Sequence, residues 1–340
     1  METVRVEDAV GMVLAHDLTR VVPGESKGAA FKKGHIVRPE DVDLLKRMGK
    51  YHINIFELDA NSLHEEEAAR RIAQAVSGGG LARTKPSEGK VEIKSTMRGL
   101  LDVDVDALAA INAVDSVILA TRHRHTLVEP GTVVAGTKVI PLVIAKEKIE
   151  AVEKITGAHQ PVLSVHPLFS LKVGIVVTGT EVYEGRIQDK FAPTLKGKVE
   201  NMGGVCMGVV FAPDDLTAIR EKIGAFLTQG AELVMVSGGM AVDADDVTPA
   251  AIRSVAPSVV TYGSPVLPGA MFMLAYAGDV PVVGVPACGM FRKITVLDLL
   301  LPRMFAKEKI ARRDITALAH GGLCLNCPVC RYPVCPFGKA

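Results

Sequence analysis

The chain has 340 residues, of which 48% are hydrophobic and 23% are charged. Its 39 Lys and Arg residues are balanced by 38 Asp and Glu residues, so the formal net charge is only +1. This balance argues against nucleic acid or a membrane surface as the main partner. The chain is too long for one ordinary domain, so we expect about two or three, each with a sizeable core.

Two segments bear on where the protein acts. Residues 1–5 (Met-Glu-Thr-Val-Arg) contain no apolar run of the kind found in a secretory signal. Residues 255–278 carry no charge, but prolines and glycines interrupt them. A membrane-spanning helix of about 20 residues rarely tolerates so many breakers. We therefore expect a buried core segment there and a cytoplasmic protein with no membrane partner.

Residues 1–76 predict an N-terminal α+β region. The elements expected there are helical spacing at residues 7–14, an amphipathic helix at 37–48, a strand at 51–56 and a charged helix at 62–76. The glutamates in the first turn of the last helix suit the helix dipole. The Ser-Gly-Gly-Gly run at 77–80 then predicts a loop or linker.

Residues 77–165 predict a mixed or mostly β subdomain, with strands at 114–120 and 132–144. From 166 to 306, strand and helix patterns alternate. The predicted strands are 171–177, 205–211, 232–236 and 280–285, and the predicted helices are 192–202, 214–228, 248–254 and 288–305. Such alternation is typical of a mostly parallel sheet with helices on both faces, whose ligands bind beyond the strand C-termini. Residues 307–340 form a basic stretch and a Cys-rich tail.

Three turns follow these strands: Thr178-Gly179-Thr180-Glu181, Pro213-Asp214-Asp215, and the run from Ser237-Gly238-Gly239 to Asp246. Glycines after a strand let the backbone approach a ligand, and a helix N-terminus offers N–H groups to an anion. Thr248 is predicted to cap the next helix and Pro249 to occupy its first turn. Three aspartates in the last turn would repel a bare anion. A ligand with N–H donors as well as a phosphate, or a bridging divalent cation, is therefore indicated. Alternatively, the aspartates only cap a helix and solvate a turn.

In order and spacing, these turns resemble the molybdopterin-binding, Mog-type domain. That domain is shared by molybdenumtransferases and molybdopterin adenylyltransferases of molybdenum cofactor synthesis. The family pattern is Thr-Gly-Asp-Glu, then Asp-Asp, then Ser-Gly-Gly followed by Asp and Thr. The resemblance implies a three-layer α/β domain over residues 166–306. Residues 31–56 are similar to the segment that precedes this domain in molybdenumtransferases.

The resemblance also implies functional residues. The candidate catalytic residues are Glu181, Asp214 and Asp246, and the candidate pterin-binding residues are Thr178, Gly179, Ser237, Gly238, Gly239 and Thr248. Molybdate is an anion, and each carboxylate contact with it at about 4 Å costs about 4 kcal/mol at an effective dielectric of about 20. We therefore expect Mg²⁺ near these carboxylates. The chain departs from the family at Thr180, where Asp is usual, and at Cys288, within Pro-Ala-Cys-Gly instead of Pro-Gly-Asn-Pro.

Three functions remain open on the sequence. The first is metal insertion from molybdate into molybdopterin. The second is adenylyl transfer from Mg-ATP, since the Asp-Val-Thr-Pro run at 246–249 is closer to the adenylyltransferase version of that turn. The third is a non-catalytic carrier or redox sensor. The resemblance implies molybdopterin and molybdate as ligands and a homo-oligomer as the assembly. A molybdoenzyme or another cofactor-synthesis protein is a further candidate partner, and the choice of molybdenum or tungsten stays open.

The six cysteines fall into two kinds. Cys206 and Cys288 stand singly among apolar residues and predict buried thiols. The tail holds Cys324, Cys327, Cys330 and Cys335, with Pro directly after the last. Because no secretion signal is present, we expect a metal rather than disulfides. The spacing of the first three cysteines is similar to a ferredoxin run, in which the last Cys can serve a different cluster, whereas zinc ribbons have two separated Cys pairs. An iron–sulfur cluster is favoured over zinc, with reducible free thiols as the third alternative and a further ligand from elsewhere conceivable.

Overall fold

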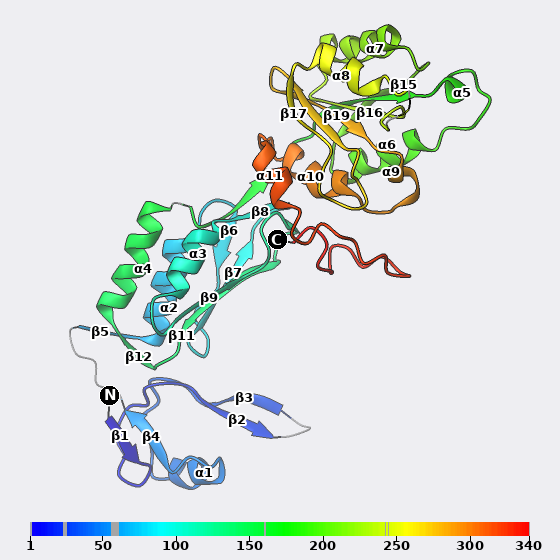
Figure 1. The fold of residues 1–340 in the computed structure, drawn as a ribbon. Helices are drawn as coiled ribbons and strands as arrows, with labels where there is room; N and C mark the ends of the chain where they lie inside the picture. The colour runs from blue at the N-terminus through cyan, green and yellow to red at the C-terminus, as the bar shows by residue number, and fades with distance from the viewer. Residues whose placement is uncertain are drawn as a thin grey trace. The chain divides into compact units, whose positions relative to one another are not determined.

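The computed structural model describes residues 2–22, 26–55, 61–159, 161–241, 243 and 245–339. The chain divides into two compact units (Figure 1). Unit 1 consists of Met1–Met97, Leu101–Arg122 and Val128–Val165, and unit 2 consists of Arg98–Leu100, His123–Leu127 and His166–Ala340. The three turns and the Cys-rich tail all belong to unit 2.

The N-terminal part of unit 1 has a small core of its own. Its elements are β1 (Glu2–Arg5) paired with β4 (His52–Ile55), β2 (Leu18–Val22) paired with β3 (Ser26–Phe31), and α1 (Asp41–Arg47). The helix predicted at 7–14 is wrong. The N–H groups of Gly11 and Leu14 donate to Val37 and His35 across the chain instead of to residues four positions earlier. Phe56, the last residue of the predicted strand, lies outside the described residues.

The remainder of unit 1 is an antiparallel sheet covered by helices. The sheet has the order β6 (Leu81–Arg83), β7 (Lys90–Ser95), β11 (Val133–Val139), β9 (Val117–Thr121). Apolar residues of α2 (Glu65–Val76), α3 (Val105–Asn112) and α4 (Lys146–Ala158) share one core with it (Figure 1). A three-stranded sheet that is not confined to unit 1 has the order β10 (Leu127–Val128), β8 (Gly99–Val103), β13 (Leu163–Pro167). The helix predicted from residue 62 begins only at Glu65, because β5 (Ser62–His64) pairs with β12 (Val143–Ala145).

Unit 2 is built on one mixed sheet. Its order is β15 (Val205–Ala212), β14 (Lys172–Thr178), β16 (Leu233–Ser237), β19 (Val280–Val285), β18 (Met273–Ala277), β17 (Ser258–Tyr262). The first four strands run parallel, and β18 runs antiparallel to both of its neighbours, β19 and β17. The predicted α/β class with a mostly parallel sheet is therefore confirmed. β17 and β18 both lie within the uncharged stretch, and no helix among the described residues is long and apolar enough to cross a membrane.

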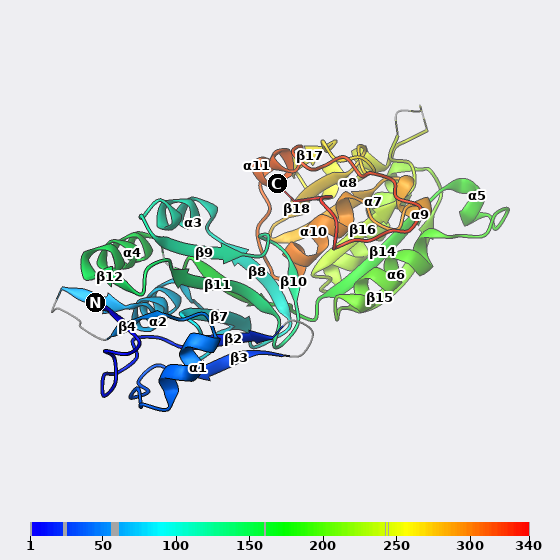
Figure 2. The same ribbon diagram turned by 90° about the horizontal axis from the view of Figure 1, so that it is seen from below.

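Helices cover both faces of this sheet, as the resemblance implied (Figure 1 and Figure 2). Along β14, Ile175 and Val177 pack with α6 (Phe191–Asn201) and α10 (Val296–Phe305), whereas Val176 packs with α7 (Leu216–Thr228) and α8 (Thr248–Val255). Because successive side chains of a strand point to opposite faces of the sheet, β14 contributes apolar residues to a separate core on each face. The helix predicted at 288–305 divides into α9 (Cys288–Phe291) and α10, because Thr295 forms a capping box with Asp298 and starts a new helix.

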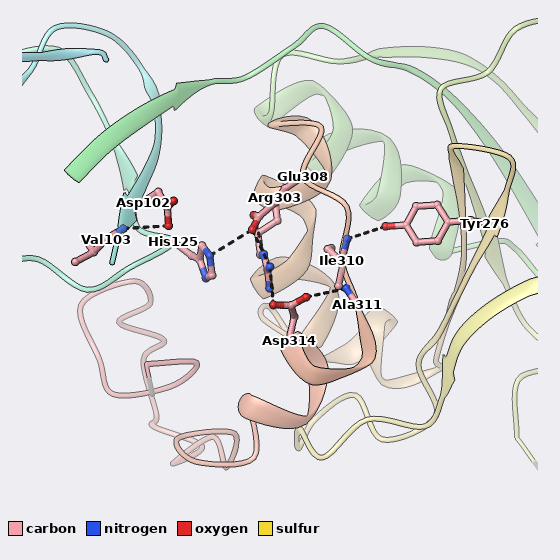
Figure 3. Close-up of polar contacts among 9 residues, drawn as sticks. All are labelled: Asp102, Val103, His125, Tyr276, Arg303, Glu308, Ile310, Ala311 and Asp314. Atoms are coloured by element: carbon pink, nitrogen blue, oxygen red, sulfur yellow. Dashed lines mark hydrogen bonds and ion pairs between the residues drawn. The ribbon is translucent and has the colours of Figure 1, made fainter. Parts of the chain in front are cut away.

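A buried ion-pair network fastens the segment after α10 to the domain (Figure 3). Arg303 is only 4% exposed, and its side chain donates two hydrogen bonds of 2.8 Å to Glu308. Its Nη2 atom also lies 3.2 Å from Oδ1 of Asp314, in α11 (Arg312–Ala317). The Tyr276 hydroxyl accepts a hydrogen bond of 3.0 Å from the N–H of Ile310. These contacts hold residues 308–314 against α10, directly before the tail.

Candidate functional site

The first and second turns are joined by hydrogen bonds. Thr178 ends β14, Gly179 has a φ of +136°, and Thr180 starts the short helix α5 (Thr180–Tyr183). The backbone N–H of Thr180 donates to Oδ2 of Asp214 at 2.9 Å, and its hydroxyl donates to the same oxygen at 3.1 Å. The N–H of Asp214 in turn donates to the Thr180 hydroxyl at 3.2 Å. Asp214 therefore holds the loop after β14 against the loop after β15.

The third turn closes on the first through its two glycines. A Cβ added to Gly238 would lie 2.2 Å from the carbonyl oxygen of Thr178, and one added to Gly239 would lie 2.8 Å from the hydroxyl of Thr248. The φ angles of these glycines are +93° and +54°. Only glycine combines such backbone angles with such close approach. The added Gly239 Cβ would also lie 3.6 Å from Oδ1 of Asp214, so all three turns meet at one edge of the sheet.

Thr248 contributes to this junction in a way the sequence did not predict. The residue is fully buried, and its hydroxyl lies 3.2 Å from the hydroxyl of Thr178. α8 begins at Thr248, with Val247 as the N-cap, so the prediction that Thr248 caps the helix is wrong. Its hydroxyl is directed to β14 instead. Pro249 does occupy the first turn, as predicted.

Ser237 is the last residue of β16, and its hydroxyl has no hydrogen-bond partner among the described residues. The residue has no exposed surface, and its Oγ atom has no hydrogen-bond partner within the part of the chain that the structure describes. Leaving a buried hydroxyl unpaired costs about 1–3 kcal/mol. A ligand or an ordered water that reaches this oxygen would offset that cost. Ser237 adjoins Gly238, so the oxygen lies beside the point where the turns converge.

The three predicted acidic residues are not drawn into one cluster. Glu181 is exposed, and its Oε2 atom lies 3.5 Å from where a Cβ on Gly179 would stand. Asp246 is half-buried and accepts a hydrogen bond of 2.9 Å from the N–H of Asp243, so it also stabilises its own turn. Val242 and Ala244, in the same turn, lie outside the described residues. Burial raises the pKa of Tyr262, and the negative charge of Asp246 adds to this shift.

No group of three or more His, Cys, Asp or Glu side chains in the described ranges could hold a metal ion. An all-protein Mg²⁺ cage from Glu181, Asp214 and Asp246 is therefore not formed. Mg²⁺ is commonly bound by one or two carboxylates together with substrate phosphates, and the hard carboxylate oxygens present here suit that arrangement. The structure brings together Thr178, Asp214, Gly238, Gly239 and Thr248.

Sequence reasoning missed one residue of the site, Thr180. Its position was read only as a departure from the family's usual Asp. In the structure its hydroxyl and its N–H both bind Asp214. A Thr after a strand-end glycine, followed by an Asp after the next strand, was the available signal. It becomes informative only when β14 and β15 are known to be neighbours.

The four tail cysteines differ in burial. Cys324 and Cys335 are half-buried, whereas Cys327 and Cys330 are exposed, and all four line one cavity of about 560 Å³. Cys206 and Cys288, predicted as buried thiols, are both half-buried. Burial raises the pKa of the Cys288 thiol.

Comparison with known families agrees with this architecture. Residues 174–306 match a family model described as "Probable molybdopterin binding domain", and residues 3–57 match a domain of unknown function. The chain carries a Mog-type molybdopterin-binding domain, and the resemblance carried by the three turns is confirmed.

Curated relatives match over a short segment. The CinA-like protein of Mycobacterium sp. (strain MCS) is 34% identical over 83 residues, which are 24% of this chain and 20% of the relative. The CinA-like protein of Mycolicibacterium vanbaalenii is 37% identical over 79 residues, or 23% of this chain and 19% of the relative. The chain thus spans about a fifth of the length of these curated relatives.

Solved structures resemble part of the chain. The molybdopterin biosynthesis enzyme MoaB from Thermus thermophilus is 18% identical, covers 39% of this chain and 91% of its own, and has a TM-score of 0.35. The protein CinA from Thermoplasma acidophilum is 15% identical, covers 40% of this chain and 98% of its own, and also has a TM-score of 0.35.

Proposed function

We propose that the protein binds molybdopterin where the three turns meet and inserts metal from molybdate into it, as a molybdenumtransferase-type enzyme of cofactor synthesis. One observation carries the proposal. Gly238 and Gly239 expose backbone beside Asp214, with the Ser237 hydroxyl, buried and lacking a partner among the described residues, directly next to them. Such an edge suits a ligand that needs close backbone approach and polar recognition together.

Each part of molybdopterin has a chemical counterpart at this edge. The amino-pyrimidinone ring offers N–H groups, which carboxylates accept in strong, charge-assisted hydrogen bonds. Glu181, Asp214 and Asp246 supply such acceptors. The terminal phosphate suits backbone N–H groups at Gly238 and Gly239 and at the start of α8.

The two oxygens of Asp214 have different surroundings. Oδ2 accepts from Thr180 and fixes the loop, whereas Oδ1 lies on the side of Gly239. Asp214 is therefore the carboxylate that we assign to ligand recognition most directly. Because a carboxylate carries a negative charge, a second anion beside it requires a counter-charge.

Mg²⁺ is the counter-ion that we propose for this reason. One or two of the carboxylates of Glu181, Asp214 and Asp246 would hold it together with oxygens of the ligand. Its positive charge would offset the repulsion between these side chains and phosphate or molybdate. The residues themselves orient the pterin and keep the anion close to it.

Adenylyl transfer from Mg-ATP to the molybdopterin phosphate is the second candidate. It is favoured by the Asp-Val-Thr-Pro run at 246–249, because Pro249 lies in the first turn of α8 and the helix N-terminus suits a phosphate. A non-catalytic carrier or redox sensor is the third. In each case we propose a cytoplasmic homo-oligomer, with a molybdoenzyme or another cofactor-synthesis protein as the partner that receives its product or its bound cofactor.

Calorimetry on the full chain tests the proposal. We expect anaerobic titration with molybdopterin and Mg²⁺ to give saturable heat. A Gly239→Ala variant should lose that heat, because the added methyl group meets the Thr248 hydroxyl at the site. The matched control is Gly230→Ala, which has a φ of +84° but open space and lies between α7 and β16, at the opposite end of that strand. No heat with the unaltered protein would overturn molybdopterin binding.

Activity assays then separate the candidates. Molybdate-dependent formation of active cofactor supports metal insertion, and AMP attached to molybdopterin supports adenylyl transfer. If the protein binds molybdopterin tightly but forms neither product, both enzyme activities are rejected and the carrier role remains.

A further inference from the structure

The Cys-rich tail is a loop held at both of its ends. Near its start, the N–H of Cys324 donates to the carbonyl oxygen of Leu267 at 2.8 Å. The N–H of Leu267 donates to the carbonyl oxygen of Gly322, also at 2.8 Å. Near its end, the N–H of Gly338 donates to Gly321 at 3.0 Å. The tail is therefore packed on the molybdopterin-binding domain, beside α10 and α9 (Figure 2).

The side of this loop that faces α10 is apolar and is in direct contact with that helix. Phe337 is only 3% exposed and belongs to the same core as α10. A Cβ added to Gly338 would lie 2.4 Å from a methyl group of Leu299, so the chain touches the helix directly. Cys324 and Cys335 pack at the margin of this core. Two of the thiols are thus fixed in position by packing.

The loop encloses the cavity of about 560 Å³ whose wall includes Cys324, Cys327, Cys330 and Cys335. The opposite wall is formed by residues 291–294, which connect α9 with α10. Four thiols from a short stretch of chain therefore line one hollow. Within the described part of the chain, the residues that line this cavity include none from the three turns.

Two kinds of metal centre can be compared with this cavity: a single zinc ion and a polynuclear iron–sulfur cluster. A zinc ion needs four ligand atoms near 2.3 Å, about one common point. In the described ranges no three His, Cys, Asp or Glu side chains form a group that could hold a metal ion, so a metal centre of either kind requires the exposed Cys327 and Cys330 to move toward the packed Cys324 and Cys335. The cysteines nevertheless share one cavity. Cys thiolates spaced by two residues, as in Cys324, Cys327 and Cys330, are the usual ligands of an iron–sulfur cluster, and a Pro follows the last cysteine as it does in a ferredoxin run. The last spacing is four residues here instead of three, and the fourth cysteine of such a run ligates a second cluster in two-cluster ferredoxins, so we assign Cys335 from its place in the cavity and not from its spacing.

Charge and hydrogen bonding at the cavity agree with an anionic centre. Arg292, Lys293 and Arg331 also line it, and their positive charges would offset the negative charge of four thiolates. The N–H of Asn326 donates to the Sγ atom of Cys324 at 3.5 Å, and Arg292 donates to the Asn326 side chain. N–H groups directed at ligand sulfurs are among the features that tune a cluster's reduction potential.

We propose that this cavity binds an iron–sulfur cluster through the thiolates of Cys324, Cys327, Cys330 and Cys335. Each thiol loses its proton on ligation, and the sulfur–iron bonds join the exposed cysteines to the two that are packed. The cluster cross-links the tail within itself, beside residues 291–294. The proposal goes beyond the proposed molybdopterin chemistry and stands without it.

Metal analysis of the full chain, purified anaerobically and reconstituted with iron and sulfide, tests this site. We expect iron and acid-labile sulfide in equal amounts, visible charge-transfer absorption, and a paramagnetic signal after reduction with dithionite. A Cys327→Ser, Cys330→Ser double variant should lose iron to background. Because both cysteines are exposed, its apoprotein should melt like the unaltered apoprotein.

The control is Cys206→Ser, which changes a cysteine of β15 in the same unit and should retain the full iron content. Three outcomes would overturn the proposal: stoichiometric zinc in place of iron, no iron and sulfide after reconstitution, or unchanged iron in the double variant. Molybdopterin binding is measured separately, so loss of one site does not count against the other.

Discussion

One carboxylate oxygen of Asp214 accepts two hydrogen bonds from Thr180, from the backbone N–H at 2.9 Å and from the hydroxyl at 3.1 Å. These residues lie at the ends of neighbouring parallel strands, β14 and β15. These hydrogen bonds join the loop after β14 to the loop after β15, so the two loops form one continuous surface. Because Oδ1 faces Gly239, the carboxylate also links this surface to the third turn.

Asp214→Asn is expected to weaken molybdopterin binding by about 10- to 100-fold, because charge-assisted hydrogen bonds contribute about 1.5–3 kcal/mol. Stability should fall by only about 1 kcal/mol, since the amide oxygen can still accept from Thr180. Calorimetry and chemical unfolding measure the two effects. The control is Asp215→Asn, at the N-cap of α7, where Asn also caps well, so affinity and stability should both change little. Equal affinity in both variants would contradict the role of Asp214.

Ser237→Ala removes the buried hydroxyl that has no partner in the described part of the chain. We expect the free protein to keep its stability or gain up to about 1 kcal/mol, because no protein hydrogen bond is lost and desolvation is relieved. Molybdopterin affinity should fall about tenfold if the ligand reaches this oxygen. Thermal melting with and without ligand distinguishes the effects. A destabilised free protein with unchanged affinity would instead identify a structural hydroxyl.

Gly238→Ala should destabilise the domain by about 3 kcal/mol or more, because strain in the left-handed region adds to a close contact with backbone. The added Cβ would lie 2.2 Å from the Thr178 carbonyl oxygen. Gly230→Ala has a similar φ of +84° with nothing nearby, so it should cost only about 1 kcal/mol. Urea unfolding of both variants gives the difference. Equal losses would mean that the close approach of the turns contributes nothing.

Arg303→Met is expected to destabilise the protein by about 2–4 kcal/mol, because Glu308 and Asp314 lose their buried partner. Arg313→Met, an exposed change in α11, is the control and should cost less than about 0.5 kcal/mol. Denaturant unfolding at neutral pH compares them. A loss in the Arg303 variant no larger than the control would argue against a supporting role for the network in Figure 3.

The same network predicts a pH dependence. Burial opposes ionisation of Asp314, but the Ala311 N–H and the Arg303 charge outweigh it and lower the pKa of this carboxyl. Its contribution to stability is therefore present above its unfolded pKa of about 3.9 and is lost as the pH falls through the lower folded value. Below about pH 4, Arg303→Met should lose stability less steeply than the unaltered protein. Parallel curves would contradict this coupling.

Much of unit 2 could be read from local sequence. The strand at 280–285 was predicted with the bounds that the structure gives, and β14, β15 and β16 differ by one residue at one or both ends. These strands are central and buried, so runs of apolar residues mark them clearly. The antiparallel strands β17 and β18 were not recognised, because their segment carries no charge and its prolines and glycines conceal the alternation.

The order of the turns, their glycines and acidic residues, and the cysteine spacing are properties of the sequence alone, and they were enough to indicate the domain. Only the tertiary structure decided that Thr180 binds Asp214, that the Thr248 hydroxyl meets Thr178 instead of capping a helix, and that the four tail cysteines share one cavity. Propensity and turn chemistry depend on near neighbours in the chain. Hydrogen bonds and packing between residues 34 to 70 positions apart depend on which strands and loops become adjacent, and that is settled by burial of the whole core.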